Sequence, residues 1–215
     1  MSHFSVYVFT NDRDVDSLLA PYDEDITVAP YVEYTKEKAI EKIRKEIEDY
    51  KNSKLYKEWL SDPTKYKENC RNEEHIRYLE EDFPKKLKWT DEECYEDMKK
   101  WYDEKMIDAD GNLLSTYNPN SKWDWYKVGG RWNGALITKA GSHLNSALVK
   151  DVDWSKTNIP FAFVNNIGEW FEKGKMGWWA CVSNAKEEDA WNEEFKKFLD
   201  TLSEDTLVTI VDCHI

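Results

Sequence analysis

Glycine is missing from the first half of this chain. None occurs before Gly111, and all eight glycines of the 215 residues follow from there. Glycine supplies the positive backbone φ angles that tight turns need, so its absence favours helices over hairpins. The composition therefore predicts a helical first half and a turn-rich second half, with the change near residue 110.

Long apolar runs and cysteine motifs are also missing. No stretch of 18 apolar residues occurs, so no membrane-spanning helix is expected. The opening MSHFSVYVFT lacks the basic start and the long apolar core of a secretory signal. The four cysteines form no CxxC motif, which favours reduced thiols over a disulfide framework. We therefore expect a cytoplasmic protein that does not contact membranes.

Standard cofactor and metal motifs do not occur either. The chain has no phosphate loop, no dinucleotide fingerprint, no HExxH zinc motif and no nucleophile elbow. We therefore expect no cofactor and no metal.

Basic stripes are absent, and the acidic side chains gather in two segments. Of the net charge of −13, residues 11–34 contribute one basic and seven acidic side chains, and residues 184–215 contribute three and nine. Direct binding of nucleic acid needs Lys and Arg to neutralise phosphates, so it is not expected. Acidic segments suit either simple solvation or a protein partner with a basic surface. The candidate partner-binding residues are Asp12, Asp14, Asp16, Asp23, Glu24, Asp25, Glu187 and Glu188.

Strand patterns stand at both ends of the chain. Residues 3–10 alternate with a period of two, and Leu207 to Val211 is apolar on both faces, as in an interior strand. Helical patterns lie between them. Thr35 can cap the first helix, Thr90 and Glu93 form a capping box, and Asn184 with Glu187 indicates the start of a last helix. One further helix is expected to end before Pro84.

These patterns predict a single α+β domain over residues 1–215. Its sheet is mainly antiparallel and contains both terminal strands. A helical insertion occupies about 35–105, and residues 106–215 form a Trp-rich β part with a C-terminal helix packed on the sheet.

The stretch YNPNSKWDWYKVGGRWNGAL is the least random part of the chain. It predicts two strands joined by a tight turn at Gly129–Gly130, with Trp123 and Trp125 on one face. Arg131 can then stack on an indole or pair with Asp124. Two interpretations stay open. The stretch either locks a hairpin onto the core or forms a pocket for a nucleotide-like ligand, built from Lys122, Trp123, Asp124, Trp125 and Arg131.

Several segments together resemble a known family. MSHFSVYVF, LAPYDE, STYNPNSKWDWYKVGGRWNG, GKMGWWACVS and TLVTIVDCHI look like uncharacterised proteins carried by tailed phages and bacteria. The resemblance covers nearly the whole chain. It implies a mobile-element context and the cytoplasm of a host cell, and it implies no particular chemistry.

The carboxyl end carries the second candidate site. Asp212 and His214 share one face of the last strand, and Cys213 lies on the other. If the first and last strands pair antiparallel, His3 comes near His214. Such a group can act as a general base or bind a metal. A polar end on a buried strand explains the same residues without any function.

Two hypotheses of different classes follow, and the sequence supports both an enzyme and a non-enzyme. The first is a non-catalytic phage or mobile-element accessory protein that inhibits a host defence complex through its acidic segments. The alternative is a small nucleotide-binding protein or hydrolase that uses the Trp/Arg pocket with His3, Asp212 and His214.

Overall fold

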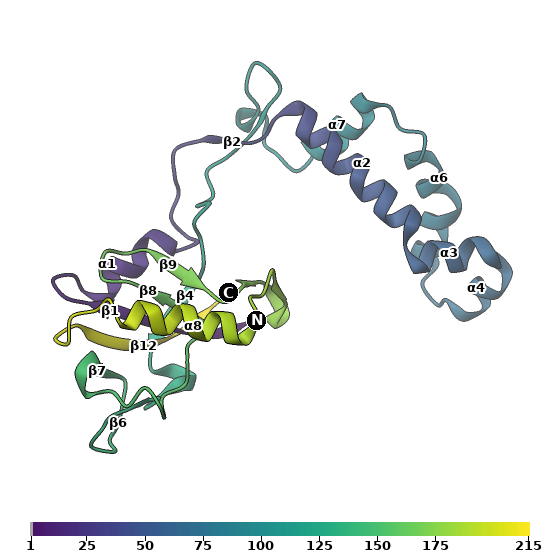
Figure 1. Cartoon of the computed structure of the whole chain (residues 1–215). Coiled ribbons are helices and arrows are strands. Elements are labelled where there is room, and N and C mark those ends of the chain that lie inside the picture. Colours follow the sequence, from purple (N-terminus) through teal and green to yellow (C-terminus); the bar gives the residue numbers. More distant parts are fainter. Residues whose placement is uncertain (1) are drawn as a thin grey trace. The chain divides into compact units, whose positions relative to one another are not determined.

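The computed structural model describes residues 2–215, which divide into two compact units (Figure 1). The first, which we call the sheet unit, combines the chain up to Val28 with Tyr117–Ile215. The second, the helical unit, is Ala29–Thr116. The helical insertion expected at about 35–105 lies inside the helical unit, whose bounds are wider. Among the described residues, no helix is long and apolar enough to cross a membrane.

The sheet unit is built around one six-stranded sheet with the order β4-β12-β1-β8-β9, in which β7 also pairs with β12. The α-helices described in this unit are α1 (Val15–Leu19) and α8 (Glu188–Leu199). Its strands are β1 (His3–Thr10), β4 (Trp125–Val128), β5 (Leu136–Ile137), β6 (His143–Leu144), β7 (Ser146–Leu148), β8 (Ala162–Val164), β9 (Trp170–Glu172), β10 (Lys175–Met176), β11 (Val182–Ser183) and β12 (Leu207–His214).

The expected α+β class and the central place of both terminal strands are confirmed. β1 and β12 pair antiparallel over their full length, from His3 opposite His214 to Thr10 opposite Leu207. One neighbouring pair, β1 with β8, is parallel, and the other pairs of this sheet are antiparallel. Both strands are almost wholly buried, because strands or helices cover them on every side.

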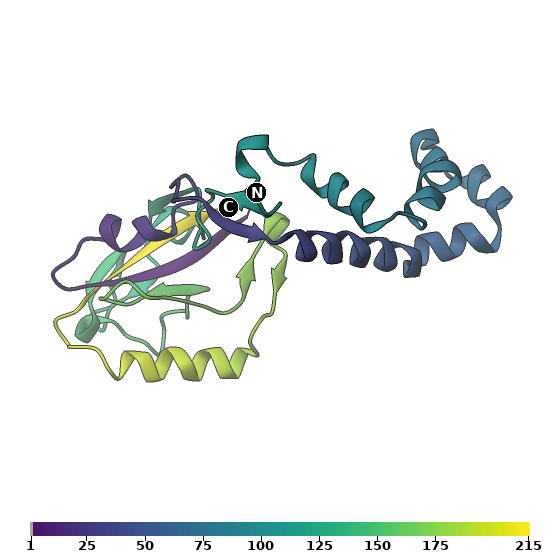
Figure 2. The same ribbon diagram turned by 90° about the horizontal axis from the view of Figure 1, so that it is seen from above.

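The two faces of this sheet are covered by different helices. Phe4, Val6 and Val8 of β1 pack with Leu18 and Leu19 of α1. The alternate residues of β1 face the other way, and their apolar members pack under α8, whose buried face is Trp191 and Phe195. Figure 2 shows α1 and α8 on opposite sides of the sheet. The face of the sheet that α8 covers carries polar residues instead of apolar ones at the end where the two chain termini lie.

The helical unit consists of one helix of 17 residues, several shorter helices and one two-stranded sheet. A π-helical turn, Tyr78–Asp82, joins α5 to α6. The elements are β2 (Tyr31–Tyr34), α2 (Lys36–Asn52), α3 (Lys54–Ser61), α4 (Pro63–Asn69), α5 (Glu73–Arg77), α6 (Phe83–Lys86), α7 (Asp91–Lys99) and β3 (Leu113–Ser115). Its two apolar clusters centre on Ile43 with Tyr95 and on Tyr56 with Phe83.

Local capping signals placed some helix ends correctly and missed others. Thr35 caps α2, and Thr90 with Glu93 forms the predicted capping box of α7. The helix expected to stop before Pro84 continues, because Pro84 lies in the first turn of α6, where a proline costs no hydrogen bond. The last helix begins after Glu187, not after Asn184, which takes a positive φ of 52°.

Candidate active site

Three neighbouring strands place one ring each in a row on the same face of the sheet. In the strand register, His3 of β1 lies opposite His214 of β12, and His214 lies opposite Trp125 of β4. The next row contains Ser5, Asp212 and Lys127 in the same strand order. The antiparallel pairing, which the sequence left open, brings His3 beside His214, at the end of the sheet that holds both chain termini (Figure 1).

Each of the two histidines is held by a carboxylate. His3 Nδ1 lies 2.9 Å from Asp212 Oδ1, and His214 Nδ1 lies 2.7 Å from Asp124 Oδ1. A carboxylate accepts hydrogen bonds, so Nδ1 of each ring carries a proton. Nε2 of both rings is then left for other chemistry. Asp212 and His214 are only 3% and 4% exposed, which makes this a buried polar group with satisfied partners.

The two imidazoles touch each other and the Trp125 indole. The His3 and His214 ring centroids are 4.9 Å apart, with the rings nearly perpendicular. The Trp125 ring stacks on His214 at 4.9 Å and 15°, and it meets His3 edge-on at 5.4 Å. Trp125 is 45% exposed, so the indole shields one histidine while part of it faces solvent.

The two adjacent glycines hold Asp212 and do not form a hairpin. Gly129 and Gly130 have φ angles of 72° and 52° and form the start of a 3-10 turn, so no strand follows them directly. β4 pairs with β12, and the short strand β5 further along pairs with β6 instead. A Cβ on Gly130 would lie 2.3 Å from the Asp212 Cβ. This close approach lets the Arg131 backbone N–H donate to Asp212 Oδ2 at 3.0 Å. Both carboxylate oxygens of Asp212 are thereby satisfied.

The structure separates the residues that were expected to form one Trp/Arg pocket. Trp123 is 7% exposed and donates its indole N–H to the Leu19 carbonyl, on the α1 side of the sheet. Trp123 and Trp125 were predicted to share a face, which is wrong because β4 begins only at Trp125. Lys122 forms an ion pair with Glu172 at 2.8 Å and lines a different pocket.

Arg131 does not pair with Asp124, because that carboxylate is taken by His214. Its guanidinium is exposed and makes no hydrogen bond or ion pair with the described residues. The three tryptophans of this stretch also differ: Trp123 is buried, Trp132 is half-buried and Trp125 is exposed. The interpretation in which Arg131 and its tryptophans lock a hairpin onto the core is therefore wrong.

Cys213 lies on the far side of the strand, as the alternation predicted. It is fully buried among apolar side chains that include Phe4 and Trp123. Burial raises the pKa of its thiol well above the ordinary value, and the neighbouring Asp212 and Asp124 charges raise it further. The thiolate form that a nucleophile needs is thus disfavoured.

α1 of the first acidic segment and α8 of the second lie on opposite faces of the sheet (Figure 2). The acidic side chains of these two helices therefore do not form one patch. Several of the candidate carboxylates also have local roles. Asp14 caps α1 through the Ser17 N–H, Asp16 accepts from the Tyr126 hydroxyl, and Glu188 pairs with Lys173.

The remaining carboxylates of the set fall into two groups. Asp23 accepts from the Asp25 N–H, and Glu24 accepts from the Tyr117 hydroxyl. Asp12, Asp25 and Glu187 are exposed and form no ion pair among residues 2–215. These three are the candidate carboxylates that stay open to a partner through their charge.

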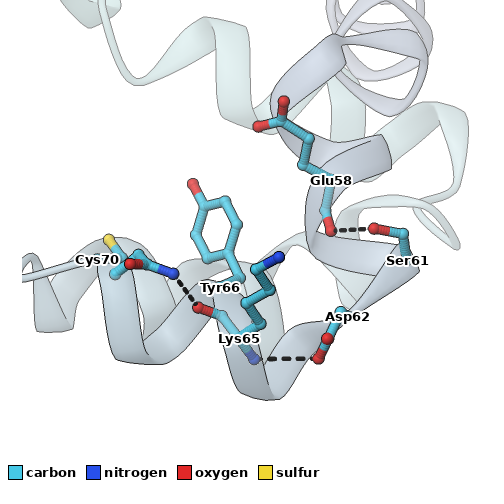
Figure 3. Close-up of a pocket in the computed structure, with 7 residues that line it drawn as sticks. Glu58, Ser61, Asp62, Lys65, Tyr66 and Cys70 are labelled. Carbon is cyan, nitrogen blue, oxygen red and sulfur yellow. Dashed lines mark hydrogen bonds between the residues drawn. The ribbon is translucent and has the colours of Figure 1, made fainter.

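A pocket in the helical unit was not expected from the sequence, and its polar groups are explained by helix ends. It measures about 560 Å³ between α3 and α4 (Figure 3). Ser61 donates to the Glu58 carbonyl, and Asp62 accepts from the Lys65 N–H as the cap of α4. Tyr66 bonds to His75 at 3.2 Å. No pair of side chains in it is arranged like the two histidines.

Asp124 and Lys127 are the members of the histidine site that sequence reasoning misplaced or omitted. Asp124 was expected near Arg131, and Lys127 was not among the candidate residues. Knowledge of the register of β4 against β12 would have identified Asp124 and Lys127 as members of the site, because that register places Lys127 opposite Asp212. No local pattern encodes that register.

Among residues 2–215, no group of three or more His, Cys, Asp and Glu side chains is arranged to hold a metal ion. No protein-family model matches this chain, and comparisons with curated proteins and with solved structures found no match. The functional assignment consequently depends on the residues and their geometry.

Proposed function

We propose that this protein is a hydrolase in which His3 and His214 act together as a general acid and a general base on a phosphodiester. The observation that carries the proposal is the contact of two imidazoles, 4.9 Å between centroids, each with Nδ1 on its own carboxylate. A fixed proton on Nδ1 leaves Nε2 free to accept or donate, which is the atom that acid–base catalysis uses.

The reaction needs one neutral and one protonated imidazole. The neutral ring accepts a proton from water at Nε2 while the water oxygen forms a bond to phosphorus. The bond from phosphorus to the leaving oxygen breaks, and the protonated ring gives that oxygen its proton. A phosphodiester and water thus become a phosphomonoester and an alcohol, and proton exchange with solvent restores the two rings. Asp212 and Asp124 keep the rings oriented throughout.

Charge on the site favours a phosphate over a neutral ester. Asp212 and Asp124 contribute two negative charges. Lys127, which lies opposite Asp212 in the strand register, and Arg131, whose backbone N–H binds Asp212, contribute two positive ones. One protonated imidazole therefore gives this part of an otherwise acidic protein a net positive charge. The developing negative charge on the phosphoryl oxygens is stabilised by such cations.

The test is hydrolysis of bis(4-nitrophenyl) phosphate by the full-length chain. His3→Ala and His214→Ala should each reduce the rate by about 100- to 10,000-fold, because each removes one proton-transfer group. Added imidazole should restore part of the rate in these two variants, which a purely structural role would not produce. His143→Ala is the matched control, since this exposed histidine of the same unit contacts Gly134 instead. Equal rates for all three variants and the wild type would reject the proposal.

A further inference from the structure

We infer that the substrate of this site is a nucleotide, with its base stacked on Trp125 and its phosphate bound by Lys127 and Arg131. The inference depends on the function proposed above for the histidines and specifies the substrate class. It comes from two features that acid–base chemistry alone does not require: an exposed indole beside the imidazoles, and two cations without ion-pair partners.

The Trp125 indole is a ready stacking surface. His214 covers one side of the ring at a 15° angle, and His3 touches the ring edge, which fixes the plane of the indole. The 45% of Trp125 that stays exposed is available to a planar group. Nucleic-acid bases stack on aromatic side chains regardless of base identity, because every base presents a π face.

Lys127 and Arg131 form no ion pair among the described residues, whereas most other basic side chains of the sheet unit do. Lys122, Lys150, Lys173 and Lys186 each form an ion pair with a carboxylate. Lys127 and Arg131 are exposed and form no ion pair among residues 2–215, although the chain carries 13 more acidic than basic side chains. Lys127 lies opposite Asp212 in the strand register, and the Arg131 backbone binds Asp212. Both residues therefore start from backbone positions next to Asp212, and their exposed side chains can supply charge for the phosphate of a ligand.

Base stacking and phosphate binding are assigned to two adjacent rows of residues that run across the strands. The ring row, Trp125–His214–His3, presents the stacking surface and the proton-transfer groups. The neighbouring row presents Lys127 and Asp212, with Arg131 following the glycine turn. A nucleotide lying across these rows has its base and its phosphate on adjacent rows. A simple phosphodiester without a base would use only the second row and the histidines.

The experiment compares two substrates that share one reactive group. Adenosine 2′,3′-cyclic phosphate and glycerol 1,2-cyclic phosphate carry the same five-membered cyclic phosphodiester, with and without a base. The intact chain should prefer the nucleoside compound by at least about tenfold in kcat/KM, as stacking of one base implies. Trp125→Ala should remove that preference, and Trp125→Phe should keep most of it. Lys127→Ala and Arg131→Ala should raise KM for both compounds.

Matched controls exist in the same unit. Trp179 is 79% exposed and lies in the β10–β11 connection, so Trp179→Ala removes an exposed indole without touching the histidines. Lys175→Ala removes an exposed lysine of β10 that also lacks an ion pair among the described residues. Neither should change the preference for the nucleoside compound.

The outcomes distinguish this inference from the proposed function. Equal kcat/KM for the two compounds, with rates that still require both histidines, would overturn the nucleotide inference and leave the hydrolase. If neither compound is hydrolysed, binding of AMP is measured through the histidine Cε1–H resonances. AMP binding that Trp125→Ala and Lys127→Ala weaken at least about tenfold supports a nucleotide site without the proposed reaction. Absence of AMP binding, or binding indifferent to both variants, overturns the inference.

Discussion

The sheet unit and the helical unit place their polar side chains in opposite ways. In the helical unit the polar contacts lie at the surface, as helix caps such as Thr90 or ion pairs such as Arg44 with Asp91. In the sheet unit, Asp212 and His214 are buried between strands, Asp212 is bonded through both carboxylate oxygens, and His214 is bonded through Nδ1. Buried polar groups cost stability unless every partner is present. The presence of these buried polar groups at one end of the sheet is the reason we propose a site there.

The largest effect is expected from Gly130→Ala, which attacks the buried network of the sheet unit. The new Cβ would approach the Asp212 carboxylate to 2.5 Å, on a backbone with a φ of 52°. We expect a loss of about 2–4 kcal/mol in the free energy of unfolding, from left-handed strain and steric overlap together. Urea unfolding measures the loss, and hydrogen exchange should show it in β12 and not in α2.

Gly141→Ala is the control for backbone strain alone. Gly141 has a φ of 82°, and no atom lies within 4 Å of a Cβ built there. Its cost should be about 1–2 kcal/mol. If both glycine variants lose the same free energy of unfolding, the close approach of Gly130 to Asp212 does not contribute to the cost of Gly130→Ala.

A smaller effect is expected from Thr90→Ala in the helical unit. The Thr90 hydroxyl accepts from the Glu93 N–H, and the Glu93 carboxylate accepts from the Thr90 N–H. Loss of this capping box should cost about 1 kcal/mol and should raise hydrogen exchange at the start of α7. Thr64→Ala, at an exposed threonine within α4 that caps nothing, should cost less than about 0.5 kcal/mol. Equal losses would mean that the capping box is not what stabilises α7.

Tyr50→Phe should be neutral or slightly stabilising at pH 7. The Tyr50 hydroxyl is buried without a hydrogen-bond partner among the described residues, so its removal discards an unsatisfied group. Burial also raises the pKa of Tyr50 to about 12. The folded state disfavours the tyrosinate, so this contribution to stability is complete below the unfolded pKa of about 10 and is lost as the pH rises towards 12. The variant should lose less stability than the wild type between those values. A variant that is clearly less stable at pH 7 would show that the hydroxyl has a partner.

The smallest effect on stability is expected from reversing exposed acidic charges. Asp12→Lys with Asp25→Lys on one side of the sheet, and Glu187→Lys on the other, should each change the free energy of unfolding by less than about 0.5 kcal/mol. If the chain is the inhibitor of a basic host protein that the acidic segments suggest, one of these variants should slow association at low salt and the other should not. Unchanged on-rates for both variants would remove that hypothesis.

The sequence by itself determined the local elements. The period of two predicted β1, the apolar stripe and Thr35 predicted α2, and Thr90 with Glu93 predicted the start of α7. These signals succeed because hydrogen bonds and side-chain spacing within a few residues decide them. The sequence could also predict that β1 and β12 lie in the same sheet, because the patterns at both ends of the chain are typical of strands that must be buried.

The tertiary structure decided which polar groups meet. Asp124 and Arg131 are seven positions apart in one stretch, yet Asp124 binds His214 and Arg131 stays free, because β4 pairs with β12 and not with a strand after Gly130. The sequence around Gly130 is typical of a turn. The space that a Cβ on Gly130 would need is occupied by Asp212, which lies 82 positions further along the chain. Local periodicity carries no information on strand register between distant segments, and that register alone places two histidines, two carboxylates and an indole at one end of the sheet.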